Sequence, residues 1–257
     1  MLNLRPGWQV EVLPDRAALS RVAAERFVEA GRAAMAERGG FAVALSGGST
    51  PRELYALLAG PPWRDLVDWA RTQVFWGDER CVPPDDPDSN YALARAMLLE
   101  AVAISADNVH RMRAEAADRE AAAVEYAREI ERFVPSDSDG VPRFDLMLLG
   151  LGADGHTASL LPGSALVHEQ DRLVAVTDRE REGTIRLTVT PPLLRHAAEL
   201  LFLVAGQDKA AALRAVFEGP ERPERYPAQV VRGARGEVVW LVDRAAASQL
   251  PKGAAEP

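Results

Sequence analysis

One histidine of this sequence lies in a glycine-rich segment that follows a strongly apolar run. The run is FDLMLL, residues 144–149, and the segment GLGADGHTASLLPG spans residues 150–163. An imidazole titrates near pH ~6.5 and can take or give a proton at neutral pH, so His156 is a candidate general base or acid. Asp154 stands two residues before it and is a candidate for orienting or charge-stabilising the imidazole.

The same segment also matches a dinucleotide-binding fingerprint. The matching glycines are Gly150, Gly152 and Gly155. That fingerprint requires a full crossover helix after the third glycine, in a unit of ~30 residues, whereas Pro162 interrupts this segment early. Asp154 would also lie beside the bound pyrophosphate, although Asp178 could serve as the ribose-binding acid. The pattern therefore favours a sharp turn that presents His156, and leaves dinucleotide binding as an alternative.

A second glycine loop, SGGSTPRE at residues 46–53, follows an apolar strand and opens a helix. Its glycines allow close backbone approach, and hydroxyls at a helix N-terminus suit an anion, phosphate above all. The candidate residues are Gly47, Gly48, Ser49 and Thr50. Thr50 and Glu53 also have capping-box spacing. No Walker-type lysine is present, so a nucleoside triphosphate is not indicated, and an ordinary capped turn is the structural alternative.

Two more loops carry charge at the ends of predicted strands. GDERCVPPDDPDSN, residues 77–90, surrounds Arg80 with acidic side chains. These carboxylates could bind a divalent metal, or they could fix Arg80 towards a substrate anion. GQDK, residues 206–209, ends in one of only two lysines among 30 Lys and Arg. Lys209 is therefore either a ligand for a phosphate or oxyanion, or simply an exposed lysine.

Apolar strands and amphipathic helices alternate along the chain. Strands are predicted at 8–13, 41–46, 72–77, 144–150, 173–177, 184–189, 199–205 and 236–242. Helices are predicted at 16–39, 51–59, 89–101, 118–133, 208–218 and 244–250, and residues 78–88 as a loop. Such alternation predicts an α/β fold with a mostly parallel sheet covered on both faces. We expect one domain over residues 1–250, then a short flexible tail at 251–257.

Composition limits the classes of function. A net charge of −8 and a pI near 5.2 argue against a general binder of nucleic acid or anionic membrane. A single cysteine, Cys81, excludes a disulfide framework and a cysteine-based zinc site. The N-terminus lacks the apolar core of a signal peptide, and no stretch approaches the ~20 apolar residues of a membrane span. We therefore expect a cytoplasmic protein.

Together the four loops resemble the 6-phosphogluconolactonase family. The similar segments are ALSGGSTPRELY, FWGDERCVPPDDPDSNY, FDLMLLGLGADGHTASLLPGS, RLTVTPP, FLVAGQDKAAAL, YPAQVV and WLVDRAA, which run in family order from about residue 41 to 245. Glucosamine-6-phosphate deaminases share this fold and are the close alternative. They carry a catalytic glutamate five residues after the histidine, where this chain has Leu161, and D-E-Y in place of Asp78-Glu79-Arg80. Both differences favour the lactonase.

The resemblance implies a three-layer α/β/α fold with a mostly parallel, Rossmann-like sheet. It implies hydrolysis of 6-phospho-D-glucono-1,5-lactone in the oxidative pentose phosphate pathway by water that His156 activates, without a metal or organic cofactor. No G-x-S-x-G elbow is present, so we expect no covalent intermediate. The phosphate is expected on the loop Gly47–Thr50. The cationic candidates are Arg80 and Lys209, with Arg52 and Arg186 as further ones.

The partner implied is this small sugar-phosphate lactone, with no nucleic acid and no membrane, and the protein would be a monomer or small homo-oligomer. A non-enzymatic sugar-phosphate sensor is a third hypothesis. It would keep the phosphate loop, make His156 dispensable, and usually carry a DNA-binding or effector segment. No helix-turn-helix extension is visible in the sequence, which makes this hypothesis the weakest of the three.

Overall fold

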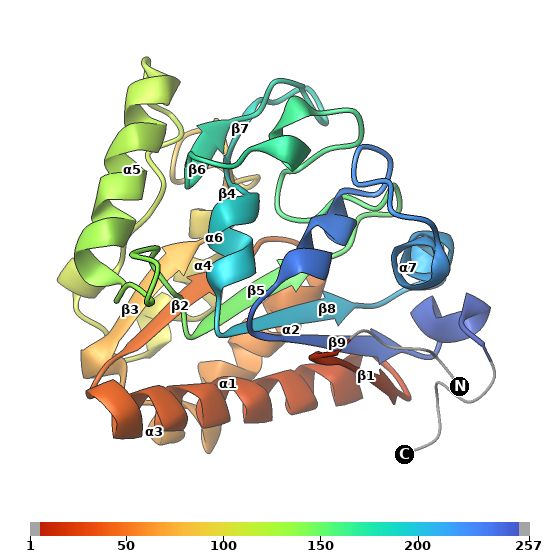
Figure 1. Ribbon diagram of the computed structural model, residues 1–257. Helices are drawn as coiled ribbons and strands as arrows, with labels where there is room; N and C mark the ends of the chain where they lie inside the picture. Colours follow the sequence, from red (N-terminus) through yellow and green to blue (C-terminus); the bar gives the residue numbers. More distant parts are fainter. Residues whose placement is uncertain (1–5, 252–257) are drawn as a thin grey trace.

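Six parallel strands form the centre of the computed structural model, which describes residues 6–251 (Figure 1). Across the sheet they are β1 (Trp8–Leu13), β9 (Glu237–Asp243), β8 (Glu199–Val204), β5 (Leu146–Gly150), β2 (Phe41–Leu45) and β3 (Thr72–Trp76). The inner strands are apolar along nearly their whole length because both faces of the sheet are covered. The predicted parallel sheet is confirmed.

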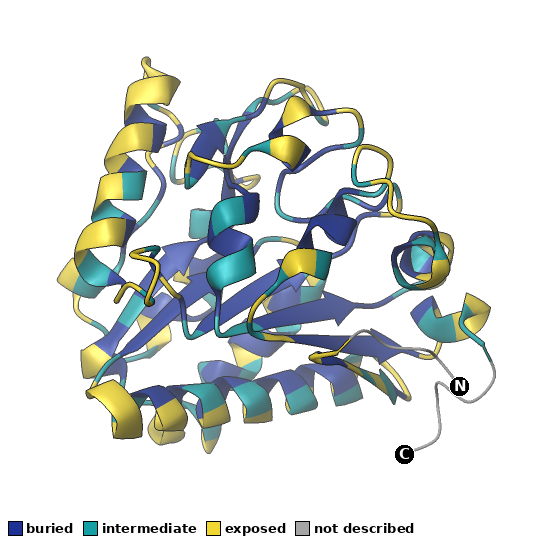
Figure 2. Cartoon of the chain, viewed as in Figure 1, coloured by how far each residue is buried: buried dark blue, intermediate teal, exposed yellow. Residues whose placement is uncertain are grey.

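Helices cover the two faces of this sheet in separate layers. One layer contains α1 (Arg16–Arg38), α2 (Ser49–Leu58), α3 (Trp63–Leu66) and α4 (Asn90–Met97). The other contains α5 (Arg119–Phe133), α6 (Pro191–His196) and α7 (Ala210–Glu218). Along β2, Val43 faces the first layer and Ala42 and Ala44 the second, as strand alternation requires. Figure 2 shows the buried strands between helices whose outer sides are exposed, which confirms the three-layer α/β/α fold.

A smaller antiparallel sheet lies beside the main one. It contains β4 (Asp78–Arg80), β7 (Arg186–Val189) and β6 (Val174–Val176), in that order. The prediction of a loop over residues 78–88 is therefore wrong at its start. A strand of three residues is too short to show the alternation of apolar and polar residues that predicts a strand. Strand β4 forms because it pairs with the distant β7, in a register that places Arg80 opposite Arg186.

The remaining elements are short. Short 3-10 helices occupy Trp69–Arg71, Leu99–Ala101, Ala106–Asn108, Ala165–His168, Gln207–Lys209, Pro227–Gly233 and Ala246–Gln249. The last of these replaces the α-helix predicted at 244–250. The expected tail falls, from residue 252 on, outside the described residues. No helix within residues 6–251 is long and apolar enough to cross a membrane.

The strand order places a crevice at one edge of the main sheet. Strands β2 and β5 are neighbours, yet the chain continues from β2 to β3 on one side and from β5 to β8 on the other. The loops that follow β2 and β5 therefore diverge and leave a gap at the carboxyl ends of these strands. In open α/β sheets ligands bind at such a switch point.

Candidate active site

A cleft of about 280 Å³ occupies this switch point, and all four loops singled out in the sequence line it. The predicted residues that line it are Gly47, Gly48, Ser49, Thr50, Arg80, His156, Arg186 and Lys209. Two predicted residues do not. Asp154 lies behind His156, and the Arg52 guanidinium lies 3.8 Å from the Met97 sulfur. Nothing in the geometry thus supports a substrate contact for Arg52.

The histidine loop is a tight turn and not the start of a crossover helix. The amide of Gly152 donates to the carbonyl of His156 at 2.8 Å, and the next helical turn begins only at Ala165. A Cβ on Gly152 would lie 1.8 Å from His156 Nδ1. Glycine is required there because the imidazole packs directly on the backbone. This geometry disfavours the dinucleotide-binding alternative and presents His156 to the cleft.

The Asp154 carboxylate holds the imidazole from behind. Asp154 Oδ1 lies 2.6 Å from His156 Nδ1, and Asp154 Oδ2 lies 2.5 Å from an Arg181 guanidinium nitrogen. Partial burial alone would raise the pKa of Asp154. The hydrogen bond and charge of His156, together with the charge of Arg181, outweigh that effect and hold the pKa well below its usual range. An ionised Asp154 requires a proton on Nδ1, which leaves Nε2 as the acceptor on the ring.

The glycine loop after β2 presents an uncapped helix N-terminus to the cleft. Helix α2 begins at Ser49, and its N-cap is Gly48 with φ of 102° and no side-chain cap. The predicted capping box of Thr50 and Glu53 is therefore wrong. Because glycine supplies no capping oxygen, the first N–H groups of α2 remain available to an anion. The buried hydroxyl of Ser46 also lines the cleft without a partner among the described residues.

Strand β4 fixes the position of Arg80. One guanidinium nitrogen donates to the carbonyl of Asp88 at 2.8 Å and to Asn90 Oδ1 at 2.6 Å. The neighbouring Glu79 is buried and accepts four hydrogen bonds, from the Arg80, Asn90 and Tyr91 amides and the Ser89 hydroxyl. Burial raises the pKa of Glu79 and these donors oppose the rise. Glu79 thus acts as a support that joins β4 to the start of α4.

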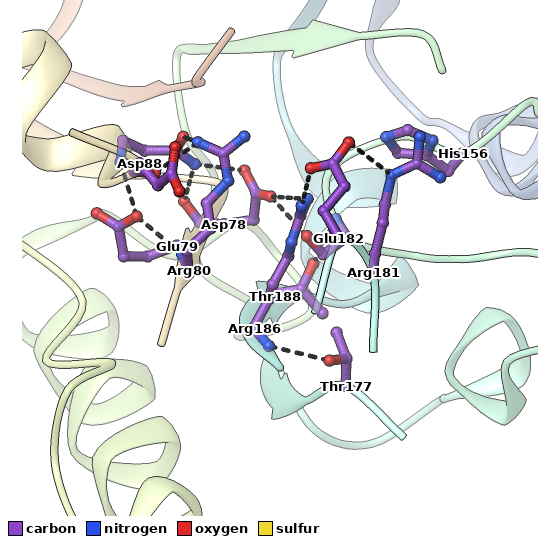
Figure 3. Close-up of polar contacts among 12 residues, drawn as sticks. Asp78, Glu79, Arg80, Asp88, His156, Thr177, Arg181, Glu182, Arg186 and Thr188 are labelled. Atoms are coloured by element: carbon purple, nitrogen blue, oxygen red, sulfur yellow. Dashed lines mark hydrogen bonds and ion pairs between the residues drawn. The ribbon is translucent and has the colours of Figure 1, made fainter. Parts of the chain in front are cut away.

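Arg186 reaches the cleft from β7 and is buried, with 4% of its surface exposed. Its guanidinium lies 4.0 Å from Asp78 and 3.0 Å from Glu182 (Figure 3). Asp78 in turn accepts a hydrogen bond from the Ser159 hydroxyl at 2.6 Å. Burial lowers the pKa of Arg186, and Asp78 opposes this. The Nε–H groups of Arg186 and of Arg80 are both buried without a partner among the described residues.

Two arginines whose buried Nε–H groups have no partner among the described residues line this one cleft. A buried donor left without an acceptor costs about 1–3 kcal/mol, so such groups are usually satisfied by a ligand or by water. Lys209 adds a further positive charge, although its Nζ lies 2.8 Å from Asp208. Among the described residues no group of three or more His, Cys, Asp or Glu side chains could hold a metal ion. The metal alternative for the acidic loop thus lacks support, and the site favours an anionic ligand.

Glu182 already occupies part of this cationic region. Its carboxylate lies 3.0 Å from Arg186 and 3.9 Å from Arg181, between the two guanidinium groups (Figure 3). Glu182 and Gly183 both have positive φ, 54° and 74°, at the tip of a two-residue hairpin closed by Arg181 and Thr184. Such turns favour Asn and Gly, and a left-handed Glu costs roughly 1 kcal/mol. The strained turn holds a carboxylate where an anionic ligand would bind.

Replacing Glu182 with glutamine is expected to tighten the binding of inorganic phosphate about fivefold. An exposed ion pair is worth up to about 1 kcal/mol, and phosphate has to displace the Glu182 carboxylate from the arginines before it can bind them. Removing this competition is worth up to about fivefold in affinity. Titration calorimetry measures the change. The control is Glu180→Gln, which removes the same charge from the same loop at an exposed position. Equal tightening in both variants would mean that only the general charge of the loop matters.

The three-layer α/β fold and a cleft lined by His156 and several cations are those of an enzyme that acts on an anionic substrate, and sequence comparison assigns the family. The family model described as glucosamine-6-phosphate isomerases/6-phosphogluconolactonase matches residues 14–240, and the chain belongs to this family. It is 44% identical to a 6-phosphogluconolactonase of Synechocystis over 84% of this chain and 88% of that protein. It is 40% identical to one of Streptomyces coelicolor over 95% of each chain. The solved 6-phosphogluconolactonase of Trypanosoma brucei superposes with a TM-score of 0.82 at 30% identity, covering 97% of this chain and 100% of that one.

Sequence reasoning missed three residues of the cleft. Arg181 and Glu182 lie in a charged stretch, DREREG, that resembles any solvated loop until β6 and β7 are paired. The Glu-Gly pair between two strands was the available signal for a tight hairpin. Asn90 had no signal of its own, because its contacts come from β4 and from the loop after β2.

Proposed function

We propose that the protein hydrolyses 6-phospho-D-glucono-1,5-lactone to 6-phospho-D-gluconate, with His156 as the general base. The observation that carries this proposal is the Asp154–His156 pair at the end of β5, facing the same cleft as the unpaired guanidinium donors of Arg80 and Arg186. An ester hydrolase needs an activated water and a stabilised oxyanion, and a phosphorylated substrate needs cations. This cleft offers candidates for all three.

The chemical step begins with His156. Its Nε2 takes a proton from water as the water oxygen attacks the lactone carbonyl carbon, and a tetrahedral oxyanion forms. The bond from that carbon to the ring oxygen then breaks, and the imidazolium returns the proton to the leaving ring oxygen. Atoms and charge balance without a covalent enzyme intermediate. Asp154 holds the imidazole in the required tautomer and stabilises the imidazolium between the two transfers.

The phosphate group is assigned to the glycine loop. The N–H groups of Gly48 to Thr50 and the start of α2 supply donors, and Lys209 and the arginines supply charge. A phosphate monoester carries −1.5 to −2 charges near neutral pH, which suits several cations in one cleft. The guanidinium groups of Arg80 and Arg186, which line the same cleft, would serve the phosphate or the developing oxyanion. A protein of net charge −8 can thus bind an anion locally.

The deaminase alternative needs a carboxylate where Leu161 stands. Leu161 is buried, with 5% of its surface exposed, and does not line the cleft. A sensor would need no proton acceptor, yet His156 is held by Asp154, which is itself paired with Arg181. We therefore favour the lactonase. We further propose a cytoplasmic enzyme, monomeric or a small homo-oligomer, that requires no metal or organic cofactor and binds no nucleic acid.

The test is hydrolysis of freshly generated 6-phosphogluconolactone by the wild-type protein, followed as acid release above the uncatalysed rate. A large rate enhancement is expected. The same preparation is assayed for ammonia release from glucosamine 6-phosphate, where no activity is expected. Ammonia release without lactone hydrolysis would replace the lactonase with the deaminase. Phosphate binding without either activity would favour the sensor.

A further inference from the structure

We propose that Asn90 is the positioning residue for Arg80, at the point where segment 77–90 meets the glycine loop after β2. This inference rests on the proposed function, in which Arg80 contacts the substrate. Asn90 is the first residue of α4, is 1% exposed and lines the cleft. A buried asparagine must find partners for both ends of its amide, so its contacts decide what it can hold.

The orientation of the Asn90 amide is fixed by its donor end. Asn90 Nδ2 donates to the carbonyl of Asp78 at 2.8 Å and to Asp78 Oδ1 at 3.1 Å. Both are acceptors only, so the nitrogen must face Asp78. The oxygen must then face Arg80, whose guanidinium nitrogen donates to it at 2.6 Å. One side chain therefore connects the buried carboxylate of β4 to the cation of the same strand.

The backbone of Asn90 is held as firmly as its side chain. Its amide donates to Glu79 Oε1 at 2.7 Å, and the helix that it begins is capped by Ser89, whose hydroxyl accepts from the Ala92 amide. Glu79 also accepts from the Tyr91 amide. The Asn90 side chain thus starts from a rigid point, as a group that positions another must.

The glycine loop packs on this same amide. A Cβ on Gly47 would lie 1.7 Å from Asn90 Oδ1 and 2.4 Å from its Cγ. Gly47 therefore has to be glycine because the Asn90 amide fills the space beside its Cα. The proposed phosphate loop thus lies directly against the side chain that holds the Arg80 guanidinium.

Arg80 depends on this contact because its other restraints are few. Its only other side-chain hydrogen bond among the described residues goes from the same nitrogen to the carbonyl of Asp88. Its Nε–H is buried and unpartnered. Without Asn90, the guanidinium can rotate towards the acidic segment 85–88 and away from the cleft. A misplacement of ~1 Å in a substrate-contacting group can cost up to about 10²-fold in rate.

A double-mutant cycle in the full-length protein tests this role, with lactone hydrolysis as the readout. Arg80→Ala is expected to lower kcat/KM about 10²-fold and Asn90→Ala about tenfold. In the Arg80→Ala background, the Asn90 change is expected to cost less than twofold, because Asn90 then has no guanidinium to position. Asn108→Ala is the matched control, since it truncates the same side chain outside the cleft.

A merely structural Asn90 would give the opposite result. The tenfold loss would then persist in the Arg80→Ala background and overturn the proposal. Added guanidinium at millimolar concentration is expected to restore part of the activity of Arg80→Ala, and less in the double variant; equal rescue would also contradict it. Asn90→Ser, which suits a helix start, serves if Asn90→Ala does not fold. A wild-type protein without lactonase activity would contradict the proposed function itself. Full activity of Arg80→Ala would contradict only the substrate contact of Arg80, and with it the positioning role of Asn90.

Discussion

His156→Ala is expected to lower kcat for lactone hydrolysis about 10³-fold while phosphate binding changes less than twofold. General base catalysis by a positioned side chain contributes about 10²–10⁴-fold. The two carboxylates that line the cleft, Asp78 and Glu182, are already paired with Ser159 and Arg186. The phosphate contacts lie on other loops and remain. Lactone hydrolysis by the purified variant measures the first effect, and titration with inorganic phosphate the second.

The matched control for this variant is His168→Ala, an exposed histidine without a partner among the described residues. It is expected to retain wild-type activity. Full activity of His156→Ala would leave the proposed substrate unchanged but would exclude His156 as the general base. A loss of activity together with lost phosphate binding and a lowered melting temperature would assign His156 a structural role instead.

The pH dependence follows from the state of the same pair. Only the neutral imidazole can accept the proton, so kcat/KM is expected to fall at low pH as His156 becomes protonated. Because His156 and Arg181 hold the pKa of Asp154 well below its usual range, the carboxylate stays ionised across this limb. The acid limb should therefore follow a single proton. A steeper, two-proton limb would show that Asp154 or another acid titrates with His156.

The cleft could be predicted from sequence to the extent that its parts are local. The glycine loop, the histidine and the cations each come directly after an apolar strand in the sequence. Because parallel strands end at the same edge of a sheet, these residues are expected to lie near one another. This reasoning found His156, Arg80 and Lys209. It failed where position depends on distant pairing. Strand β4 is defined by β7, more than a hundred residues later, and this pairing brings Arg186 beside Arg80.

Arg52 shows the converse limit. Its place in the glycine loop suggests a phosphate contact, yet helix α2 directs its side chain towards Met97 and away from the cleft. Arg52 is the fourth residue past the N-cap Gly48, so its side chain lies about one turn along the helix from the first N–H groups that face the cleft. A local motif thus predicts the backbone site better than the direction of a particular side chain.

Asp154→Asn is expected to lower kcat about 10²-fold or more although the shape of the cleft is preserved. The ionised carboxylate requires Nδ1–H on His156 and leaves Nε2 free to accept the proton from water. An asparagine can instead donate its amide hydrogen to Nδ1, which places the ring hydrogen on Nε2 and blocks the base. A comparable change in a Ser-His-Asp triad costs about 10⁴-fold.

Thermal melting distinguishes this tautomer effect from simple loss of structure. The tautomer effect is expected to lower kcat while the melting temperature stays at its wild-type value. Loss of structure would lower both. Asp171→Asn, at an exposed position outside the cleft, is the matched control and should leave both unchanged. A variant with wild-type kcat would mean that the turn backbone alone orients His156, and that the 2.6 Å contact between Asp154 and the ring contributes nothing to turnover.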